Sequence, residues 1–445
     1  MRLKQHDGGV EDGDVAALSR GGSTPTKLRP KLEQRSHKST SNLATLLIRS
    51  CCRDWSIPLI TTGLLFALLL PQQPDPLYAA RWRAELTWEI GYEEDGVTFG
   101  RIMDIATSQD GAVFALDLSN HAVAVLRPPA AARLIGREGS GPGEFRAPSS
   151  LGFLGDTLWV RDPRLMRLTF FDHDGQVLRT AKIGSEGEGP YRPTLAGALL
   201  PRGTAVVELE PSQAALFRMG GGASVLATPI LIVNRENEPL DTLAWVPVRD
   251  KAIAIRGTSY VQITTPQPFA DGPTWGMSRH RGEVVIVNRE SPSSSADSTF
   301  TIRWHDYLGR VLRERSYSYS PKPISSQTTD SLFSFHVDRL VASTSWLDGR
   351  QRAYDAVRAA LYIPDFYSPV RQLVVGQDGT VWLQTLGHWR TGTTWIVLSE
   401  LGDPIGSVEA PAGLRIMAAS RDHFWGIQLG RLDVQLLAMY TIQRE

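Results

Sequence analysis

From about residue 90 onward, the sequence alternates short apolar runs with turns rich in glycine, proline and acidic residues. The segments 90–117 and 135–162 follow the same steps: Ile-Gly, a glycine-rich acidic loop, a Phe, an apolar run, a turn, and a second apolar run ending in Asp. A third copy begins at Ile183, so the starts lie 45 and then 48 residues apart. A fixed period of this size is typical of one four-stranded blade of a β-propeller. The pattern therefore predicts an all-β repeat fold.

The later copies are less regular, but their pairs of apolar runs recur with turn residues between them, as at Asp378-Gly379. Six pairs of inner strands are predicted, starting near residues 102, 150, 195, 273, 371 and 414. The sixth unit lacks a fourth strand, whereas residues 83–90 form a strand with no blade of its own. A ring leaves no open edge when its first strand completes its last blade. We therefore expect a six-bladed β-propeller closed by its N-terminal strand.

Two segments interrupt the repeat. Residues 211–230 contain three consecutive glycines and are expected to form a loose excursion in the third blade. Residues 319–369 are expected to form a helical insertion between blades 4 and 5, with Thr329 near the first N-terminus. Apolar residues at helical spacing support two short helices there: Phe333, Val337, Leu340 and Val341 in the first, and Tyr354, Val357 and Leu361 in the second.

The N-terminal part differs from the repeats. Residues 1–56 are polar and lack a sustained apolar period, so we expect a disordered tail. Residues 57–70 are uncharged and apolar, which is the length of a signal-peptide core and short for a membrane-spanning helix. The segment 57–80 is therefore predicted to be either a signal peptide cleaved after Ala79 or Ala80, or an uncleaved anchor. The propeller is predicted to occupy residues 81–445.

Charge and cysteine content exclude several classes of protein. Lys and Arg number 47, as do Asp and Glu, so the net charge is zero and argues against nucleic-acid binding. The two cysteines, Cys51 and Cys52, precede the repeats, so the propeller contains neither a disulfide framework nor a cysteine-based zinc site. No HExxH, GxSxG or cysteine nucleophile occurs within the repeats.

The segments 116–126, 136–149 and 161–175 resemble bacterial extracytoplasmic six-bladed β-propellers of the NHL-repeat-like group. The resemblance covers roughly residues 83–445. It implies a propeller fold and leaves the function open, because such rings include binding proteins, lyases, lactonases and scaffolds.

One repeat position carries polar side chains where the second strand enters the following loop. The residues at this position are Asp117, Asp162, Glu210, Asn288, Thr385 and Gln428. Carboxylate and amide oxygens are ligands for Ca²⁺, and the resemblance to lactonase-like propellers implies a metal in such a central ring. The metal hypothesis therefore names Asp117, Asp162, Glu210 and Asn288 as Ca²⁺ ligands. The alternative needs no cofactor: each carboxylate accepts hydrogen bonds from the backbone of its own turn.

The connections between blades are expected on the same face and carry cationic and aromatic residues. Guanidinium groups suit carboxylates or phosphates, and aromatic rings suit sugar faces or peptide side chains. The predicted ligand-binding mouth consists of Arg137, Arg146, Arg161, Arg167, Tyr191, Arg192, His388, Trp389 and Arg390. In the alternative interpretation, these arginines pair with nearby glutamates such as Glu138 and Glu144.

These observations support two functions. The first is an extracytoplasmic binding propeller, monomeric and located in the periplasm or cell envelope, whose partner is a protein or an anionic small molecule. The second is a metal-dependent propeller hydrolase or lyase that uses the Ca²⁺ ring. Membrane contact is expected only through residues 57–70.

Overall fold

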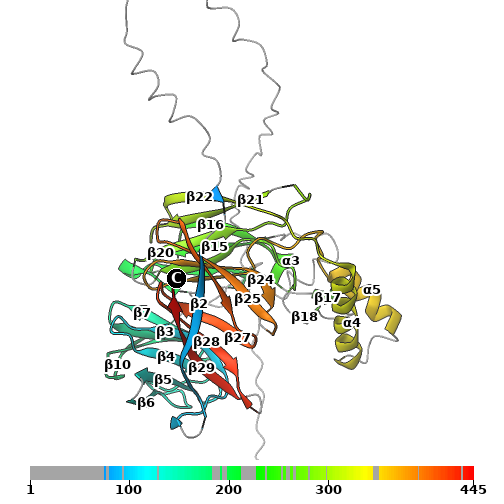
Figure 1. The fold of residues 1–445 in the computed structure, drawn as a ribbon. Coiled ribbons are helices and arrows are strands. Elements are labelled where there is room, and N and C mark those ends of the chain that lie inside the picture. The colour runs from blue at the N-terminus through cyan, green and yellow to red at the C-terminus, as the bar shows by residue number, and fades with distance from the viewer. Residues whose placement is uncertain are drawn as a thin grey trace, which may run out of the picture. The chain divides into compact units, whose positions relative to one another are not determined.

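The strands of the protein are grouped into small antiparallel sheets arranged like the blades of a propeller (Figure 1). The computed structural model describes residues 75–76, 80–92, 95–127, 130–182, 191–192, 198–211, 227–235, 238–251, 254–256, 261–263, 267–278, 281–296, 298–343, 350–388, 390–431 and 434–444. These residues all belong to one compact unit, Gln72–Glu445. The predicted tail 1–56, the apolar segment 57–70 and most of the predicted excursion, residues 212–226, lie outside the described residues.

Four sheets each contain four consecutive strands along the chain, apart from an interruption in the third. The first contains β3 (Ile102–Thr107), β4 (Val113–Asp117), β5 (Ala122–Arg127) and β6 (Ala130–Ile135), and the second contains β7 (Ser150–Leu154), β8 (Thr157–Asp162), β9 (Arg167–Phe171) and β10 (Val177–Lys182). The third contains β12 (Ala198–Leu199), β13 (Ala205–Glu208), β15 (Ala227–Val233) and β16 (Pro239–Pro247). The fourth contains β19 (Thr274–Ser278), β20 (Glu283–Asn288), β21 (Ser298–His305) and β22 (Val311–Tyr319), and β1 (Asp75–Pro76) adds a parallel edge to β22.

The last strands form an eight-stranded sheet in the order β23-β24-β25-β26-β2-β29-β28-β27. Its members are β23 (Gln372–Val375), β24 (Val381–His388), β25 (Gly392–Leu398), β26 (Pro404–Ala410), β27 (Leu414–Ala419), β28 (His423–Leu429), β29 (Gln435–Gln443) and the N-terminal β2 (Arg81–Ile90). Strand β2 pairs antiparallel with β29 from Arg83 to Ile90, with Leu86 opposite Tyr440. It pairs in parallel with β26 through two residues, Arg81 and Trp82.

Burial explains why the inner strands have continuous apolar sequences. Every residue of β4 is buried, because both faces of this strand are covered by neighbouring sheets. The outer strand β10 is almost wholly exposed. Strands covered on both faces are expected to have continuous apolar runs, whereas an outer strand tolerates charge.

Apolar clusters fill the spaces between successive sheets. Phe114 of β4 meets Phe153 of β7 edge to face, with ring centroids 4.9 Å apart. Trp382 of β24 meets Phe424 of β28 in the same way at 5.6 Å, so the two halves of the eight-stranded sheet pack face against face. Three tryptophans also pack between the sheets, since Trp159, Trp382 and Trp425 are all buried in these clusters.

Four of the first strands, β3, β19, β23 and β27, line a central cavity of about 300 Å³. Strand β3 contacts β7 on one side and β27 on the other, and β23 contacts both β19 and β27. The Gln377 amide donates to the carbonyl of Thr107 at 2.9 Å and so ties the β23–β24 turn to the end of β3. The central cavity is therefore polar where these strands end.

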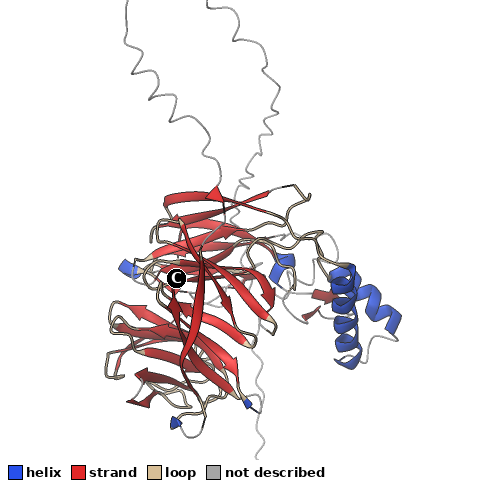
Figure 2. Ribbon diagram, viewed as in Figure 1, coloured by secondary structure: helices blue, strands red, loops and turns tan. Residues whose placement is uncertain are grey.

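The predicted helical insertion contains α4 (Ser326–Ser343) and α5 (Arg350–Ala360), which pack against each other through Phe333, Val337 and Val357 (Figure 2). The prediction placed the first N-terminus near Thr329, but α4 begins earlier because the Ser325 side chain accepts the backbone N–H of Thr328 at 3.2 Å.

The remaining short elements lie near the insertion or in the third sheet. These are α3 (Val248–Lys251), the 3₁₀ turn η2 (Pro201–Gly203), and the strand pairs β11 (Tyr191–Arg192) with β14 (Glu210–Pro211) and β17 (Ala254–Arg256) with β18 (Val261–Ile263). Helix α5 contacts β17. Within the ranges described above, no helix is both long and apolar enough to cross a bilayer.

Candidate functional site

Asp117 and Asp162 end strands β4 and β8, and each is almost fully buried. The carboxylate of Asp117 accepts the backbone N–H groups of Gly100 and Arg101, which precede the sheet. It also accepts N–H groups from the turn that follows, at Ser119 and Asn120, and the side-chain amide of Asn120. A carboxylate offers about four lone-pair positions, so this one is saturated.

The same arrangement recurs one repeat later. Asp162 accepts N–H groups from Arg146 at 2.7 Å and from Ala147 on one side, and from Arg164 and Leu165 on the other. Both carboxylates therefore join the incoming connection to the outgoing turn, and neither has oxygen lone pairs free for a cation.

Asn288 ends β20 of the fourth sheet, whereas the second strand of the third sheet, β13, ends at Glu208 and does not include Glu210. Glu210 lies in β14 and pairs with Arg192 of β11, and its side chain lies outside the described residues. The Asn288 amide contacts the Thr301 hydroxyl at 3.3 Å. Among the side chains that the structure describes, no three His, Cys, Asp or Glu residues are grouped so that they could hold a metal ion. The four-residue Ca²⁺ ring stays a prediction, and the donors to Asp117 and Asp162 weigh against it.

Three of the predicted mouth arginines lie around the connection 136–149 and form ion pairs or hydrogen bonds with it. Arg137 pairs with Glu144 at 2.9 Å, and Arg146 approaches Glu138 at 3.7 Å. Arg167 donates to the carbonyls of Ser140, Gly141 and Glu144. The backbone N–H of Gly141 and the guanidinium of Arg137 lower the pKa of Glu144. These contacts agree with the alternative in which the arginines organise their own connection.

The other predicted mouth residues are only partly described. Arg161 lies in β8 and Arg390 follows β24, and both have interactions within the protein. Trp389 and the side chains of Tyr191, Arg192 and His388 lie outside the described residues. The mouth therefore stays a prediction.

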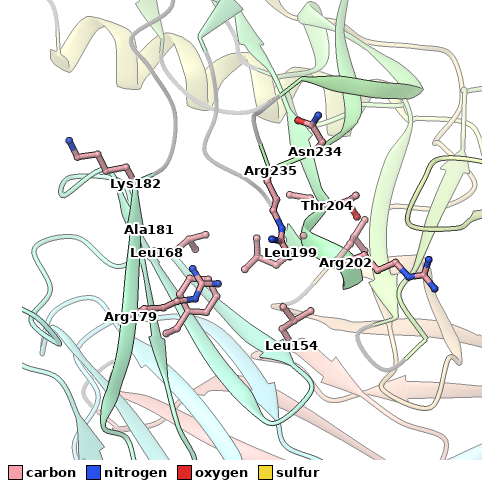
Figure 3. A pocket seen from close by; sticks show the side chains of 14 residues that line it. Leu154, Leu168, Arg179, Ala181, Lys182, Leu199, Arg202, Thr204, Asn234 and Arg235 are labelled. Atoms are coloured by element: carbon pink, nitrogen blue, oxygen red, sulfur yellow. The ribbon is translucent and has the colours of Figure 1, made fainter.

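A groove of about 570 Å³ lies between the second and third sheets, away from the predicted mouth (Figure 3). Strands β9 and β10 form one wall, and the β12–β13 and β15–β16 turns form the other. The groove is lined by Leu154, Leu168, Phe170, Arg179, Ala181, Lys182, Leu199, Leu200, Arg202, Gly203, Thr204, Ala205, Asn234 and Arg235. Among the residues that the structure describes, this lining contains four cationic side chains and no carboxylate.

Two of the cations face the groove. In Figure 3 the guanidinium groups of Arg179 and Arg235 lie towards its middle, whereas the ends of Lys182 and Arg202 point outward. The Arg179 guanidinium lies over the Phe170 ring, 3.7 Å from the ring centroid, which fixes its position. Arg202 extends towards the next sheet and lies over the Tyr307 ring at 5.1 Å.

Gly203 leaves the space that the Arg235 side chain occupies. The glycine has a φ of +79°, which other residues rarely adopt. A Cβ atom built at this glycine would overlap the Arg235 side chain. The sequence Pro201-Arg202-Gly203 thus makes a tight turn that leaves room for an arginine from the β15–β16 turn.

The charges of these four side chains are not neutralised nearby. Within the part of the chain that the structure describes, none of Arg179, Lys182, Arg202 and Arg235 forms an ion pair. This differs from the connection 136–149, where arginines and glutamates alternate.

The groove could not be predicted from the sequence for a physical reason. The predicted site residues belong to the blade connections and the ends of second strands, whereas the groove cations lie on an outer strand and in turns between strands. The available signal was local: Arg202-Gly203 and Arg235 occupy turns of one repeat, and Arg179 and Lys182 lie on the preceding outer strand. Only the packing of the two sheets brings them together.

A second polar cluster joins the helical insertion to the rest of the fold. The carboxylate of buried Asp271 forms an ion pair with Arg249 at 3.1 Å and accepts a hydrogen bond from the Tyr362 hydroxyl at 2.9 Å. The Arg249 guanidinium also lies over the Tyr362 ring. Burial raises the pKa of Asp250, and burial together with the bond to Asp271 raises the pKa of Tyr362 to about 12. Every charged group in this cluster has a partner, so the cluster is a structural tether.

No protein-family profile matches the chain, and no curated protein matches it. Solved structures with a similar arrangement include a protein of Bacteroides fragilis described as exported, at 11% identity and a TM-score of 0.42, covering 81% of this chain and 96% of that one. A member of the DUF4221 family from Bacteroides vulgatus has 10% identity, a TM-score of 0.41 and coverages of 81% and 99%. Virginiamycin B lyase from Staphylococcus aureus has 9% identity, a TM-score of 0.36 and coverages of 80% and 99%. Similarity at this level says nothing about what this chain binds.

Proposed function

We propose that the chain is an exported six-bladed β-propeller that binds an anionic ligand in the groove between β10 and the β12–β13 and β15–β16 turns. The observation that carries the proposal is the pair of fixed guanidinium groups, Arg179 and Arg235, facing one groove without a carboxylate partner among the described residues. Two like charges held beside one cavity repel each other, and an anion between them removes that repulsion.

The six-bladed architecture rests on how the eight-stranded sheet packs. Its two halves pack face to face through Trp382 and Phe424, as separate blades do. They are joined only where β2 meets β26 at Arg81 and Trp82. Counting each half as a blade, together with the four separate sheets, gives six, and β2 then completes the last one beside β29.

Export rests on the sequence alone. The apolar segment 57–70 has the length of a signal-peptide core, and the first long strand, β2, begins at Arg81, just after the predicted cleavage positions. The proposed cellular site is therefore the periplasm or cell envelope.

The hydrogen bonds that Asp117 and Asp162 accept favour a binding function over the hydrolase or lyase alternative. The metal-dependent mechanism requires Asp117 and Asp162 to coordinate a cation, but their oxygens accept backbone N–H groups. The groove cations, by contrast, are exposed and available to a ligand.

Calorimetric titration of phenyl phosphate into the wild type and the double variant Arg179→Ala/Arg235→Ala tests the proposal. We expect at least tenfold weaker binding in the variant, because it loses two charge-assisted contacts. Wild-type affinity should also fall as salt rises, since these charges are exposed. The control is Arg137→Ala/Arg146→Ala, which removes the same charge from the predicted mouth. If only this control loses binding, the ligand lies at the mouth and the groove proposal is wrong.

A further inference from the structure

We infer that the ligand of the groove is a small aromatic anion, that is, an aryl phosphate or aryl carboxylate and not an inorganic anion. This inference rests on the proposed function and adds the class of ligand to it.

The size of the groove is the first argument. Its volume of about 570 Å³ lies within the range of small-molecule pockets, about 300 to 1,000 Å³. One water molecule takes about 30 Å³ of liquid, so an inorganic phosphate fills only a small part of the groove. An anion held between Arg179 and Arg235 leaves space for an attached body.

The floor of the groove is apolar. Leu154 and Leu199 are partly exposed there and pack on the buried side chains of Leu168 and Phe170. These residues come from both sheets, so the apolar floor runs across the groove, and the guanidinium groups of Arg179 and Arg235 lie towards its middle (Figure 3). A ligand that is anionic at one end and apolar along its body matches both parts.

The position of Arg179 favours an aromatic body over an aliphatic one. One face of its guanidinium is covered by the Phe170 ring, and the side chain remains exposed, so a second ring can stack on its other face. Guanidinium groups stack on aromatic faces and still donate hydrogen bonds in their own plane. Arg179 can therefore hold both the ring and the anionic group of one ligand.

Affinities of the full-length protein for phenyl phosphate, cyclohexyl phosphate and inorganic phosphate separate these contributions. We expect phenyl phosphate to bind at least tenfold more tightly than inorganic phosphate, and severalfold more tightly than cyclohexyl phosphate. In Leu154→Ala/Leu199→Ala, phenyl phosphate binding should weaken about tenfold while inorganic phosphate binding stays unchanged. The volume-conserving Leu154→Met/Leu199→Met variant should retain phenyl phosphate binding and shows that the alanine effect comes from lost apolar surface.

The possible failures point to different parts of the argument. Equal affinities for all three phosphates would overturn the aromatic ligand and leave the anion site standing. Tighter binding of cyclohexyl than of phenyl phosphate would exclude stacking on Arg179. If neither the phosphates nor benzoate binds, or if binding survives in Arg179→Ala/Arg235→Ala, the proposed function itself is wrong. If only a polyanionic peptide binds, the ligand is not a small molecule and the inference is also overturned.

Discussion

At the residue scale, the carboxylates at the strand ends supply the hydrogen-bond acceptors that the blade connections lack. Asp162 joins two N–H groups before its sheet to two N–H groups in the β8–β9 turn. An N–H group in such a bend has no sheet partner, and leaving it unsatisfied is costly when it is buried. The sequence predicted both this role and a metal role for the same residues, because carboxylates at strand ends serve either purpose. Only the positions of the N–H groups that donate to the carboxylates distinguish the hydrogen-bonding role from the metal-binding role.

Removing the Asp162 carboxylate should therefore destabilise the fold. Asp162→Ala is expected to lose about 2 to 4 kcal/mol in a urea titration, since several buried N–H groups lose their acceptor at once. Asp162→Asn should lose less because one oxygen remains. The control Asp156→Ala, at an exposed turn of the same sheet, should change stability by less than about 0.5 kcal/mol. A chelator-sensitive wild-type midpoint would instead show that the carboxylates hold a cation.

The buried tyrosines predict how stability responds to alkaline pH. Burial raises the pKa of both Tyr319 and Tyr362 to about 12, from an ordinary value of 10.0. The unfolded chain therefore releases these protons first, so their contribution is complete below pH 10 and is lost as the pH rises towards 12. In Tyr319→Phe/Tyr362→Phe, the urea midpoint should fall less steeply between pH 9 and pH 11 than in the wild type. An unchanged slope would exclude this coupling.

At the element scale, the inner strands could be predicted and the surface between sheets could not. Local signals set the strand pairs: the turn glycines Gly175, Gly309 and Gly402 all have φ between 75° and 94°. The first helix was misplaced at its start because Ser325, not Thr329, caps it. The groove could not be found from the sequence, because its two walls belong to different repeats and periodicity within one repeat contains no information about their contact.

The contact between β2 and β26 gives a test at this scale. Gly406 lies against the Trp82 ring, and a Cβ atom there would overlap that ring. Gly406→Ala should therefore destabilise the protein by about 1 to 3 kcal/mol through overpacking, measured by thermal and urea unfolding. The control is Glu409→Ala, which removes only an exposed ion pair with Arg81 and should be nearly neutral. Equal effects of the two changes would mean that Trp82 does not anchor β2.

At the scale of the whole molecule, zero net charge conceals a local separation of charge. The connection 136–149 neutralises its own arginines, whereas the groove between the second and third sheets does not. A count of charged residues therefore argued against nucleic acid but could not reveal a site for a small anion. The arrangement of the sheets, and not the composition, creates the proposed site.

The proposed export predicts where the mature chain begins. Intact-mass measurement of protein from the cell envelope should give an N-terminus at Ala80 or Arg81, which removes β1 and retains all of β2. A chain that still contains residues 57–70 would indicate an uncleaved anchor. An N-terminus beyond Ile90 would contradict the proposed closure, because β29 would then lack its partner.

The pairing of β2 with β29 can form only after almost the whole chain has been synthesised. Thr87 and Thr441, whose hydroxyl groups meet at 2.6 Å, are 354 positions apart. At about 5 to 20 residues per second, translation needs roughly 20 to 70 s to produce the second after the first. During that interval the early strand lacks β29 and has an open edge, so we expect nascent and prematurely terminated chains to be prone to aggregation.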